Sequence, residues 1–171
     1  MERDNTKVTF KGTPMTLVGK PVKTGDNAPD FSVLDKTLTS RSLKDYAGKT
    51  KVLAIYPSID TGICAMQNRK FNEMATQLSD DVVVLSVSTD LPFAQSRFCA
   101  AEGLEKVVTL SDHRETDFGL KYGVLMEELR LLARGTIVID RNDVVRYVEI
   151  VPEIVTEPNY DAALAAIEGA L

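Results

Sequence analysis

The stretch "PSIDTGIC", residues 57–64, places a cysteine directly after a turn-prone Asp-Thr-Gly and at the start of a predicted helix. In the first turn of a helix, unpaired backbone N–H groups and the positive end of the helix dipole favour a thiolate over a thiol. The thiolate is the nucleophilic form of cysteine. Loops at the carboxyl ends of strands are also where open α/β sheets bind ligands. The position of Cys64 therefore indicates a reactive sulfur.

A second interpretation of Cys64 is structural. Cys64, Phe71 and Leu78 are spaced by seven residues, so the thiol also fits the apolar face of the same predicted helix. Free cysteine is among the most frequently buried residue types. Spacing alone leaves both interpretations open.

The second cysteine, Cys99, lies inside another predicted helix. We expect an apolar stripe beside it, formed by Leu91, Ala94, Phe98 and Ala101. A packed thiol and a half-exposed thiol are equally compatible with this position. A single histidine and two distant cysteines provide no closely spaced metal-ligand set. The segment "CAMQ", residues 64–67, also lacks the second cysteine of a Cys-x-x-Cys redox motif.

Strands and helices alternate around both cysteines. "VLAIYP" (52–57) and "VVVLSVS" (82–88) are continuous apolar runs typical of buried strands, and "VVTL" (107–110) predicts a third. A helix is expected after the first strand, with Asp60 and Thr61 as N-cap residues. "TDLP" (89–92) should cap the next helix, which ends at Gly103.

The flanking segments complete an α/β pattern. "KVTFKGTPMTLVG" (7–19) predicts an N-terminal β-hairpin, and "GTIVID" with "VVRYVEIV" (135–151) predicts a second hairpin. "TEPNYDAALAAIEGAL" (156–171) indicates a closing helix, whereas residues 113–134 combine a brief helical piece with a mixed stretch. We expect a mixed central β-sheet flanked by helices on both faces, in a single domain spanning 1–171.

Composition narrows the possible partners. The chain has 171 residues, 44% of them hydrophobic and 26% charged, which are ordinary globular proportions. Its formal net charge is −5 and no dense run of lysine and arginine occurs, so we expect no nucleic-acid partner. The start "MERDNTKVTF" lacks the apolar core of a signal peptide, and no stretch of about 18 apolar residues is present. We therefore expect a cytoplasmic protein without a membrane partner.

Longer motifs show a family resemblance. "PSIDTGIC" matches the peroxiredoxin pattern Pro-x-x-x-Thr/Ser-x-x-Cys. Two further segments, "RKFN" (69–72) and "DLPFAQSRFCAAEGL" (90–104), closely resemble the bacterial thiol peroxidase branch of the family. Members of that branch are atypical 2-Cys peroxiredoxins. The likeness runs from the N-terminal hairpin to "TEPNYDAALAAI", which is nearly the whole chain.

The resemblance implies a thioredoxin-like (peroxiredoxin) fold with an N-terminal hairpin and reduction of hydroperoxides without metal, haem or flavin. By motif position, Cys64 would be the peroxidatic cysteine and Cys99 the resolving cysteine, with Pro57 and Thr61 in the same pocket. The active-site arginine of the family corresponds to Arg134 in "LLARGTIVID". The chain departs from the family at Gly135, where alanine or another small residue is expected, and this glycine could loosen the backbone beside Arg134.

The resemblance also implies a reaction cycle. Alkyl hydroperoxides or hydrogen peroxide would oxidise Cys64 to a sulfenic acid, Cys99 would form an intramolecular disulfide with it, and thioredoxin would reduce that disulfide. A homodimer is expected. Both cysteines fall in predicted helices, and a disulfide requires Cα atoms within about 7 Å. We therefore predict that the turn around Cys64 or the helix carrying Cys99 opens during the cycle.

Three alternatives remain at this point. The main one is a thiol-based redox sensor or binding module that is switched by the same disulfide. A thioredoxin-like electron carrier is a second, although the Cys-x-x-Cys is missing. A structural domain without catalysis is the third, and it predicts an ordinary, unreactive Cys64.

Overall fold

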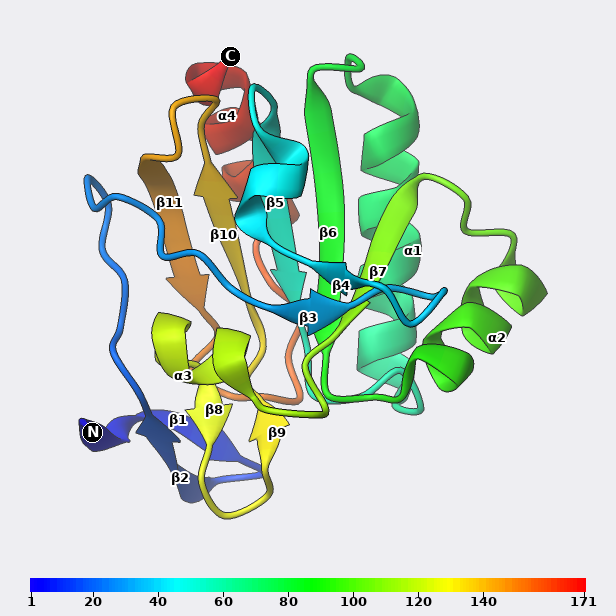
Figure 1. The fold of residues 1–171 in the computed structure, drawn as a ribbon. Helices are drawn as coiled ribbons and strands as arrows, with labels where there is room; N and C mark the ends of the chain where they lie inside the picture. Colours follow the sequence, from blue (N-terminus) through cyan, green and yellow to red (C-terminus); the bar gives the residue numbers. More distant parts are fainter.

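A computed structural model describes all residues 1–171, and a seven-stranded mixed sheet forms its centre (Figure 1). The strand order is β11-β10-β5-β6-β7-β3-β4, in which β5, β6 and β7 are parallel and the other neighbours are antiparallel. The strands are β3 (Val33–Leu34), β4 (Ser40–Arg41), β5 (Thr50–Ile55), β6 (Val82–Ser88), β7 (Val107–Ser111), β10 (Gly135–Ile139) and β11 (Val145–Ile150). The predicted mixed sheet is confirmed.

Helices cover both faces of this sheet. They are the 3₁₀ helix η1 (Leu43–Tyr46) and the α-helices α1 (Gly62–Gln77), α2 (Pro92–Glu102), α3 (Asp117–Tyr122) and α4 (Tyr160–Ala170). Val52 and Ala54 of β5 pack in one apolar cluster with residues of α1 and α4, whereas Leu53 and Ile55 pack in another with η1 and α3. Because successive strand residues point to opposite faces, a strand covered on both sides must be apolar throughout. In Figure 1, α1 and α4 lie behind the sheet and α3 lies in front.

The predicted N-terminal hairpin is present, and it begins earlier than expected. It consists of β1 (Arg3–Phe10) and β2 (Thr13–Val18). The mixed stretch that the sequence left unassigned contains β8 (Leu125–Met126) and β9 (Leu131–Leu132), which extend this hairpin into a four-stranded sheet. Leu17 of β2 pairs with Met126. Two-residue strands carry almost no local signal, so this pairing depends on the distant hairpin.

Several local signals around the two cysteine helices are confirmed. Thr61 is the N-cap of α1, and its hydroxyl oxygen accepts a hydrogen bond from the Cys64 backbone N–H. Pro92 lies in the first turn of α2, and Gly103 ends the helix in the left-handed conformation, with φ 68°. Asp60, the other candidate cap, lies just outside the helix.

Two expectations for α2 are wrong. Leu91 is the N-cap and makes no side-chain capping bond, because the Asp90 carboxylate faces the neighbouring loop instead. The expected apolar stripe is not the buried face, since Leu91 and Ala101 are exposed. The buried residues of α2 are Pro92 and Gln95. Helix α2 therefore docks partly through a polar side chain, which an apolar pattern does not reveal.

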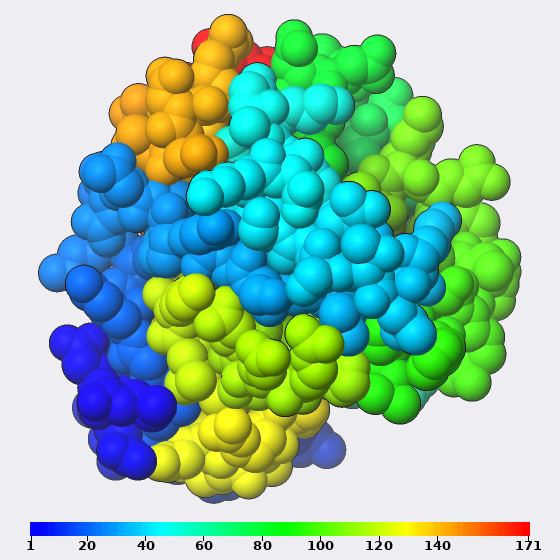
Figure 2. All heavy atoms as spheres, in the orientation of Figure 1, coloured from blue at the N-terminus to red at the C-terminus, as the bar shows by residue number.

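The space-filling view shows how the β3–β4 turn approaches α2. In Figure 2, the blue residues of this turn lie against the green residues of α2 at the right of the molecule. The N-terminal hairpin and the yellow β8–β9 turn form the lower part of the same face. None of the helices is both long enough and apolar enough to cross a lipid bilayer.

Candidate active site

Cys64 lies where the sequence places it, in the first turn of α1 after the carboxyl end of β5. The Thr61 hydroxyl oxygen accepts from Cys64 N at 3.2 Å and donates to Ser58 O at 3.3 Å. These two bonds fix the loop and the helix start to each other. Amide groups of the first turn and the helix dipole favour negative charge at this position.

The Cys64 side chain is also completely buried, at 0% exposure. It forms a small apolar cluster with Tyr56 and Ile59, and Phe98 of α2 packs against that cluster. Cys64 is therefore a packed residue of the apolar face of α1, as the structural interpretation expects. A purely structural thiol, however, needs no charged neighbour, and Cys64 has one.

That neighbour is Arg134, whose side chain is 2% exposed. Its Nη2 donates to Cys64 Sγ at 3.2 Å, its Nε donates to Ile154 O at 2.7 Å, and its Nη1 donates to Gln67 Oε1 at 2.7 Å. Each guanidinium nitrogen thus has a partner, and the group cannot swing away without losing buried bonds. A charge-assisted hydrogen bond from an arginine favours the thiolate form of a cysteine.

The residue after Arg134 corrects one expectation. Gly135 does not loosen the backbone, because it is paired in the sheet with Ile55 on one side and Ile150 on the other. A Cβ atom at this position would lie 2.3 Å from Glu149 O. Only glycine lets β11 approach this closely, so Gly135 holds the strand that positions Arg134.

Sequence reasoning missed Gln67, which links Arg134 to the sheet. Gln67 is 0% exposed, and its Nε2 donates to Ile55 O at 3.1 Å while its Oε1 accepts from Arg134. One signal was present: Gln67 is three residues after Cys64, and helix positions three apart share a face. A polar residue on the face that carries Cys64 and Phe71 requires a buried partner.

A second buried polar group supports the backbone of Cys64. Asn68 Nδ2 donates to Cys64 O at 2.9 Å, and the Ser86 hydroxyl donates to Asn68 Oδ1 at 2.5 Å. Ser86 Oγ also lies 2.9 Å from the Tyr56 hydroxyl. Burial raises the pKa of Tyr56, which keeps this phenol neutral. The first two turns of α1 are therefore fixed to β6.

The other two predicted site residues belong to the loop before α1. Pro57 is buried directly after the β5 segment, and it presents no N–H to a ligand. Thr61 is exposed, and its hydroxyl contacts Ser58 O and Cys64 N rather than the sulfur. The structure thus connects Thr61 and Arg134 directly to Cys64, whereas Pro57 lies in the same loop without a hydrogen bond to any of them.

The loop is tied to the start of α2 through Asp90. Its carboxylate accepts from the Ser58 hydroxyl at 2.9 Å, from Ile59 N at 2.8 Å and from Ser88 Oγ at 2.7 Å. Asp90 therefore connects the cysteine loop to the end of β6, which explains why it is not available as a helix cap.

Cys99 occupies a different environment. Its thiol is free and half-buried in α2, where it packs with Phe98 at the border of the cluster formed by α1, α4 and the sheet. Burial raises the pKa of Cys99, and the nearby Lys36 ammonium partly opposes this shift. Phe98 packs against the small cluster that contains Cys64 and also against the larger cluster on which Cys99 packs. Its ring therefore links the environments of the two cysteines.

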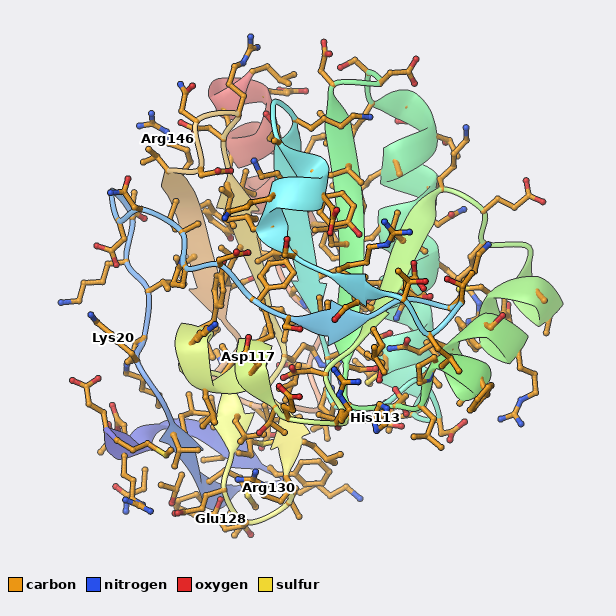
Figure 3. All side chains as sticks on the ribbon, in the orientation of Figure 1. Lys20, His113, Asp117, Glu128, Arg130 and Arg146 are labelled. Carbon is orange, nitrogen blue, oxygen red and sulfur yellow. The ribbon has the colours of Figure 1, made fainter.

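No other residue type adds an obvious reaction centre. The structure contains no group of three or more His, Cys, Asp or Glu side chains arranged to hold a metal ion. His113 lies in the loop between β7 and α3 and is labelled in Figure 3. Its backbone N–H donates to Ser111 Oγ at 3.4 Å. The chemistry of the site therefore rests on one buried sulfur and one buried guanidinium.

Comparison with known proteins gives a consistent result. The Redoxin family model matches residues 23–164. A thiol peroxidase of Oceanobacillus iheyensis is 55% identical over 92% of this chain and 96% of that protein, and one of Halalkalibacterium halodurans is 56% identical over 96% and 98%. A crystal structure of a peroxiredoxin-like protein from Aquifex aeolicus is 38% identical, covers 100% of both chains and has a TM-score of 0.90.

Proposed function

Since this chain belongs to the Redoxin family and is a thiol-dependent peroxidase, we propose that Cys64 is the sulfur that attacks the hydroperoxide. The observation that carries this assignment is the bond from Arg134 Nη2 to Cys64 Sγ, within a fully buried cluster. Cys99 has no comparable partner. Of the two thiols, only Cys64 accepts a hydrogen bond from a cationic side chain.

The first chemical step forms a sulfur–oxygen bond and breaks the oxygen–oxygen bond of the peroxide. The Cys64 thiolate supplies an electron pair to one oxygen, and the other oxygen leaves with its bonding pair and takes up a proton as alcohol or water. Arg134 and N–H groups of the loop stabilise the charge on the departing oxygen. A preorganised donor of this kind can contribute about 3 kcal/mol to the transition state. The Thr61 hydroxyl can join them by turning away from Ser58 O.

The second step consumes the sulfenic acid on Cys64. The Cys99 thiol attacks it, a disulfide forms, and the oxygen leaves as water. Cys64 and Cys99 both lie in helices and are free thiols, so one helix segment must unwind to bring them together. Helix α2 buries only Pro92 and Gln95, whereas α1 buries residues along two turns, so we propose that α2 opens.

Reduction of the disulfide requires an external dithiol. The family resemblance supports thioredoxin in this role, and it also supports a homodimer and alkyl hydroperoxides as preferred substrates. A redox sensor with the same disulfide is the competing class of function, and the thiol peroxidase relatives do not favour it.

Stopped-flow peroxide oxidation of the purified protein, followed by mass analysis of each cysteine peptide, tests the assignment. We expect Cys64 to be oxidised first and the Cys64–Cys99 disulfide to follow. With thioredoxin and its reductase present, the protein should consume many equivalents of hydroperoxide. Consumption that stops near one equivalent would instead indicate a sensor, and first oxidation at Cys99 would contradict the assignment of Cys64.

A further inference from the structure

The N-terminal hairpin is bonded to the loop 151–159, which joins β11 to α4 near the other end of the chain. Thr9 N donates to Pro152 O at 2.7 Å, and Ile154 N donates to Thr9 O at 2.9 Å. These two bonds form a parallel bridge between Thr9 and Glu153. In Figure 1, the hairpin lies below the seven-stranded sheet. The hairpin therefore reaches the main body of the protein partly through this loop.

The Glu153 carboxylate strengthens the connection by binding the turn of the hairpin. Its Oε1 accepts from Gly12 N at 2.8 Å and from Thr9 Oγ1 at 3.0 Å, and its Oε2 accepts from Lys11 N at 3.1 Å and from Val155 N at 3.2 Å. Lys11 and Gly12 form a two-residue turn, with φ at 50° and 81°. The N–H groups at the centre of such a turn have no partner in the strand ladder, and Glu153 supplies one. These bonds, first that from Gly12 N, lower the pKa of Glu153, so it is an anion at neutral pH.

The same loop holds Arg134. Ile154 O accepts from Arg134 Nε at 2.7 Å, and Val151 N donates to Arg134 O at 2.9 Å. The Nη2 atom of the same guanidinium donates to Cys64 Sγ at 3.2 Å. Because a guanidinium is planar and rigid, a shift of its partner at Nε also turns Nη2. The position of Ile154 O therefore affects the bond to the sulfur, and Glu153 directly precedes Ile154 in the chain.

Apolar packing alone does not fix the direction of the Ile154 carbonyl. The side chain is 1% exposed and packs in a cluster with residues of the hairpin and of the β8–β9 region, namely Val8, Met15, Leu17, Met126 and Ala133. Hydrophobic contact has no preferred direction, whereas a hydrogen bond weakens steeply when it is misaligned. The hydrogen bonds of Thr9 and Glu153 on either side of this backbone segment therefore orient the carbonyl.

We propose that Glu153 is a positioning residue for the reaction: it binds the turn of the N-terminal hairpin and keeps the Ile154 carbonyl directed at Arg134 Nε. This inference rests on the assignment of Cys64 in the proposed function. Glu153 makes no hydrogen bond to Cys64 or to Arg134, so it acts on the sulfur only through the loop and the guanidinium. The N-terminal hairpin then contributes to the reactivity of Cys64.

Glu128 provides a matched control, because it makes the same kind of bond to the other strand of the hairpin. Its Oε2 accepts from Thr16 N at 2.9 Å, and its Oε1 accepts from the Thr16 hydroxyl at 2.6 Å. Glu128 lies in the turn between β8 and β9 and is labelled in Figure 3. Neither residue is hydrogen-bonded to the loop 151–159. Loss of either carboxylate weakens the hairpin, but only loss of Glu153 should disturb Arg134.

The test compares Glu153→Ala, Glu153→Gln and Glu128→Ala in a Cys99→Ser background, in which Cys64 is the only thiol. Glu153→Ala should slow stopped-flow oxidation of Cys64 by about three- to tenfold and lower the ultraviolet absorbance of the thiolate at neutral pH. Glu153→Gln keeps one acceptor oxygen and should recover part of the rate. Glu128→Ala should lower the midpoint of thermal unfolding but leave the rate and the absorbance unchanged.

A milder pair of variants covers the case in which Glu153→Ala disrupts the hairpin as a whole. Thr9→Val removes the hydroxyl that donates to Glu153 Oε1 and keeps both backbone bonds of Thr9. It should slow oxidation by about twofold. Thr16→Val removes the hydroxyl bound to Glu128 and should leave the rate unchanged.

A double substitution tests whether Glu153 acts through Arg134. In an Arg134→Ala background, Glu153→Ala should slow oxidation no further, because the guanidinium is already absent. The same loss in both backgrounds, an equal loss in Glu153→Ala and Glu128→Ala, or no loss in Glu153→Ala would overturn the inference and leave the proposed function intact. The proposed function is tested separately, by the mass of the Cys64 peptide after peroxide oxidation of the unsubstituted protein.

Discussion

The surroundings of Cys64 and Cys99 are built in opposite ways. Around Cys64, the buried polar side chains of Arg134, Gln67 and Asn68 all have hydrogen-bond partners. Helix α2 instead buries only Pro92 and Gln95, and Gln95 Nε2 donates to Ser88 Oγ and Leu110 O. Fewer buried side chains therefore hold α2 than hold the first two turns of α1.

This difference teaches how one chain combines fixed and movable parts. A transition state is stabilised by groups that do not have to reorganise, which describes Arg134 and its partners. Resolution of the sulfenic acid needs a segment that opens at low cost, which describes α2. A rigid Cys64 site and a movable Cys99 helix should therefore respond differently to substitution, oxidation and pH.

The largest difference is expected between the two cysteine substitutions. Cys64→Ser should reduce peroxide consumption to the rate of buffer, because the nucleophile is lost. Cys99→Ser should allow one oxidation of Cys64 and then stop, because no thiol is available for the disulfide. Peroxide consumption coupled to thioredoxin and its reductase measures both. Equal steady-state rates for the wild type and Cys99→Ser would remove Cys99 from the cycle.

Removal of Arg134 should have the next largest effect. Arg134→Ala should slow oxidation of Cys64 by about 10²- to 10³-fold, because both the thiolate and the departing oxygen lose their cationic donor. The ultraviolet absorbance of the thiolate at neutral pH should fall as well. Arg146→Ala, which removes a half-exposed arginine bonded to Asp140, is the control. A normal stopped-flow rate in Arg134→Ala would place Arg134 outside the reaction.

Substitution of Gln67 tests whether the rigidity of Arg134 matters. Gln67→Met keeps the volume but removes the acceptor for Arg134 Nη1, and it should slow oxidation by about tenfold. Gln67→Glu restores an acceptor and should recover part of the rate, although it cannot donate to Ile55 O. Stopped-flow oxidation and thiolate absorbance check both variants. If Met and Glu behave alike, Gln67 has only a packing role.

The Cys99 helix should respond to pH in a defined direction. Burial raises the pKa of Cys99 in the folded state above that of the exposed thiol, near 8.5. The folded helix therefore binds this proton more tightly, and the stability that it gains is present below about pH 8.5 and lost as pH rises through the raised value. Amide hydrogen exchange at residues 96–102, corrected for its intrinsic pH dependence, should accelerate there.

The matching controls for this pH effect lie in the same protein. Residues 67–77 of α1 should show no such acceleration, and Cys99→Ser should abolish the effect in α2. In the oxidised protein, residues 96–102 should lose protection while residues 67–77 keep it. If the two redox forms exchange equally at both segments, the proposed opening of α2 is wrong.

The smallest effect is expected from a surface ion pair that links the two helices. Arg69 of α1 binds Glu102 of α2 through two hydrogen bonds of 2.9 Å. Glu102→Gln should therefore speed disulfide formation only about twofold, because exposed ion pairs contribute little. Glu73→Gln, on the exposed face of α1, is the control. Rapid-quench mass analysis measures the rate of disulfide formation. A slower reaction in Glu102→Gln would show that the Arg69–Glu102 ion pair does not hold α2 closed.

The parts of this molecule that sequence predicted well are those encoded within a few residues. The capping hydroxyl of Thr61, the helix end at Gly103 and the apolar run of β5 act within one turn or one strand, and the structure confirms each. The buried face of α2 was predicted wrongly, because Gln95 docks through hydrogen bonds to Ser88 and Leu110. Apolar periodicity carries no information about such bonds.

By itself, the sequence determined that a cysteine begins a helix after a buried strand, and that the chain alternates strands and helices. Only the tertiary structure decided what meets that cysteine. Arg134 is 70 residues from Cys64 and 67 from Gln67, and Gly135 is glycine because Glu149 O approaches from the next strand. Local chemistry sets where a helix begins, whereas contacts between distant segments exist only after the whole sheet has packed.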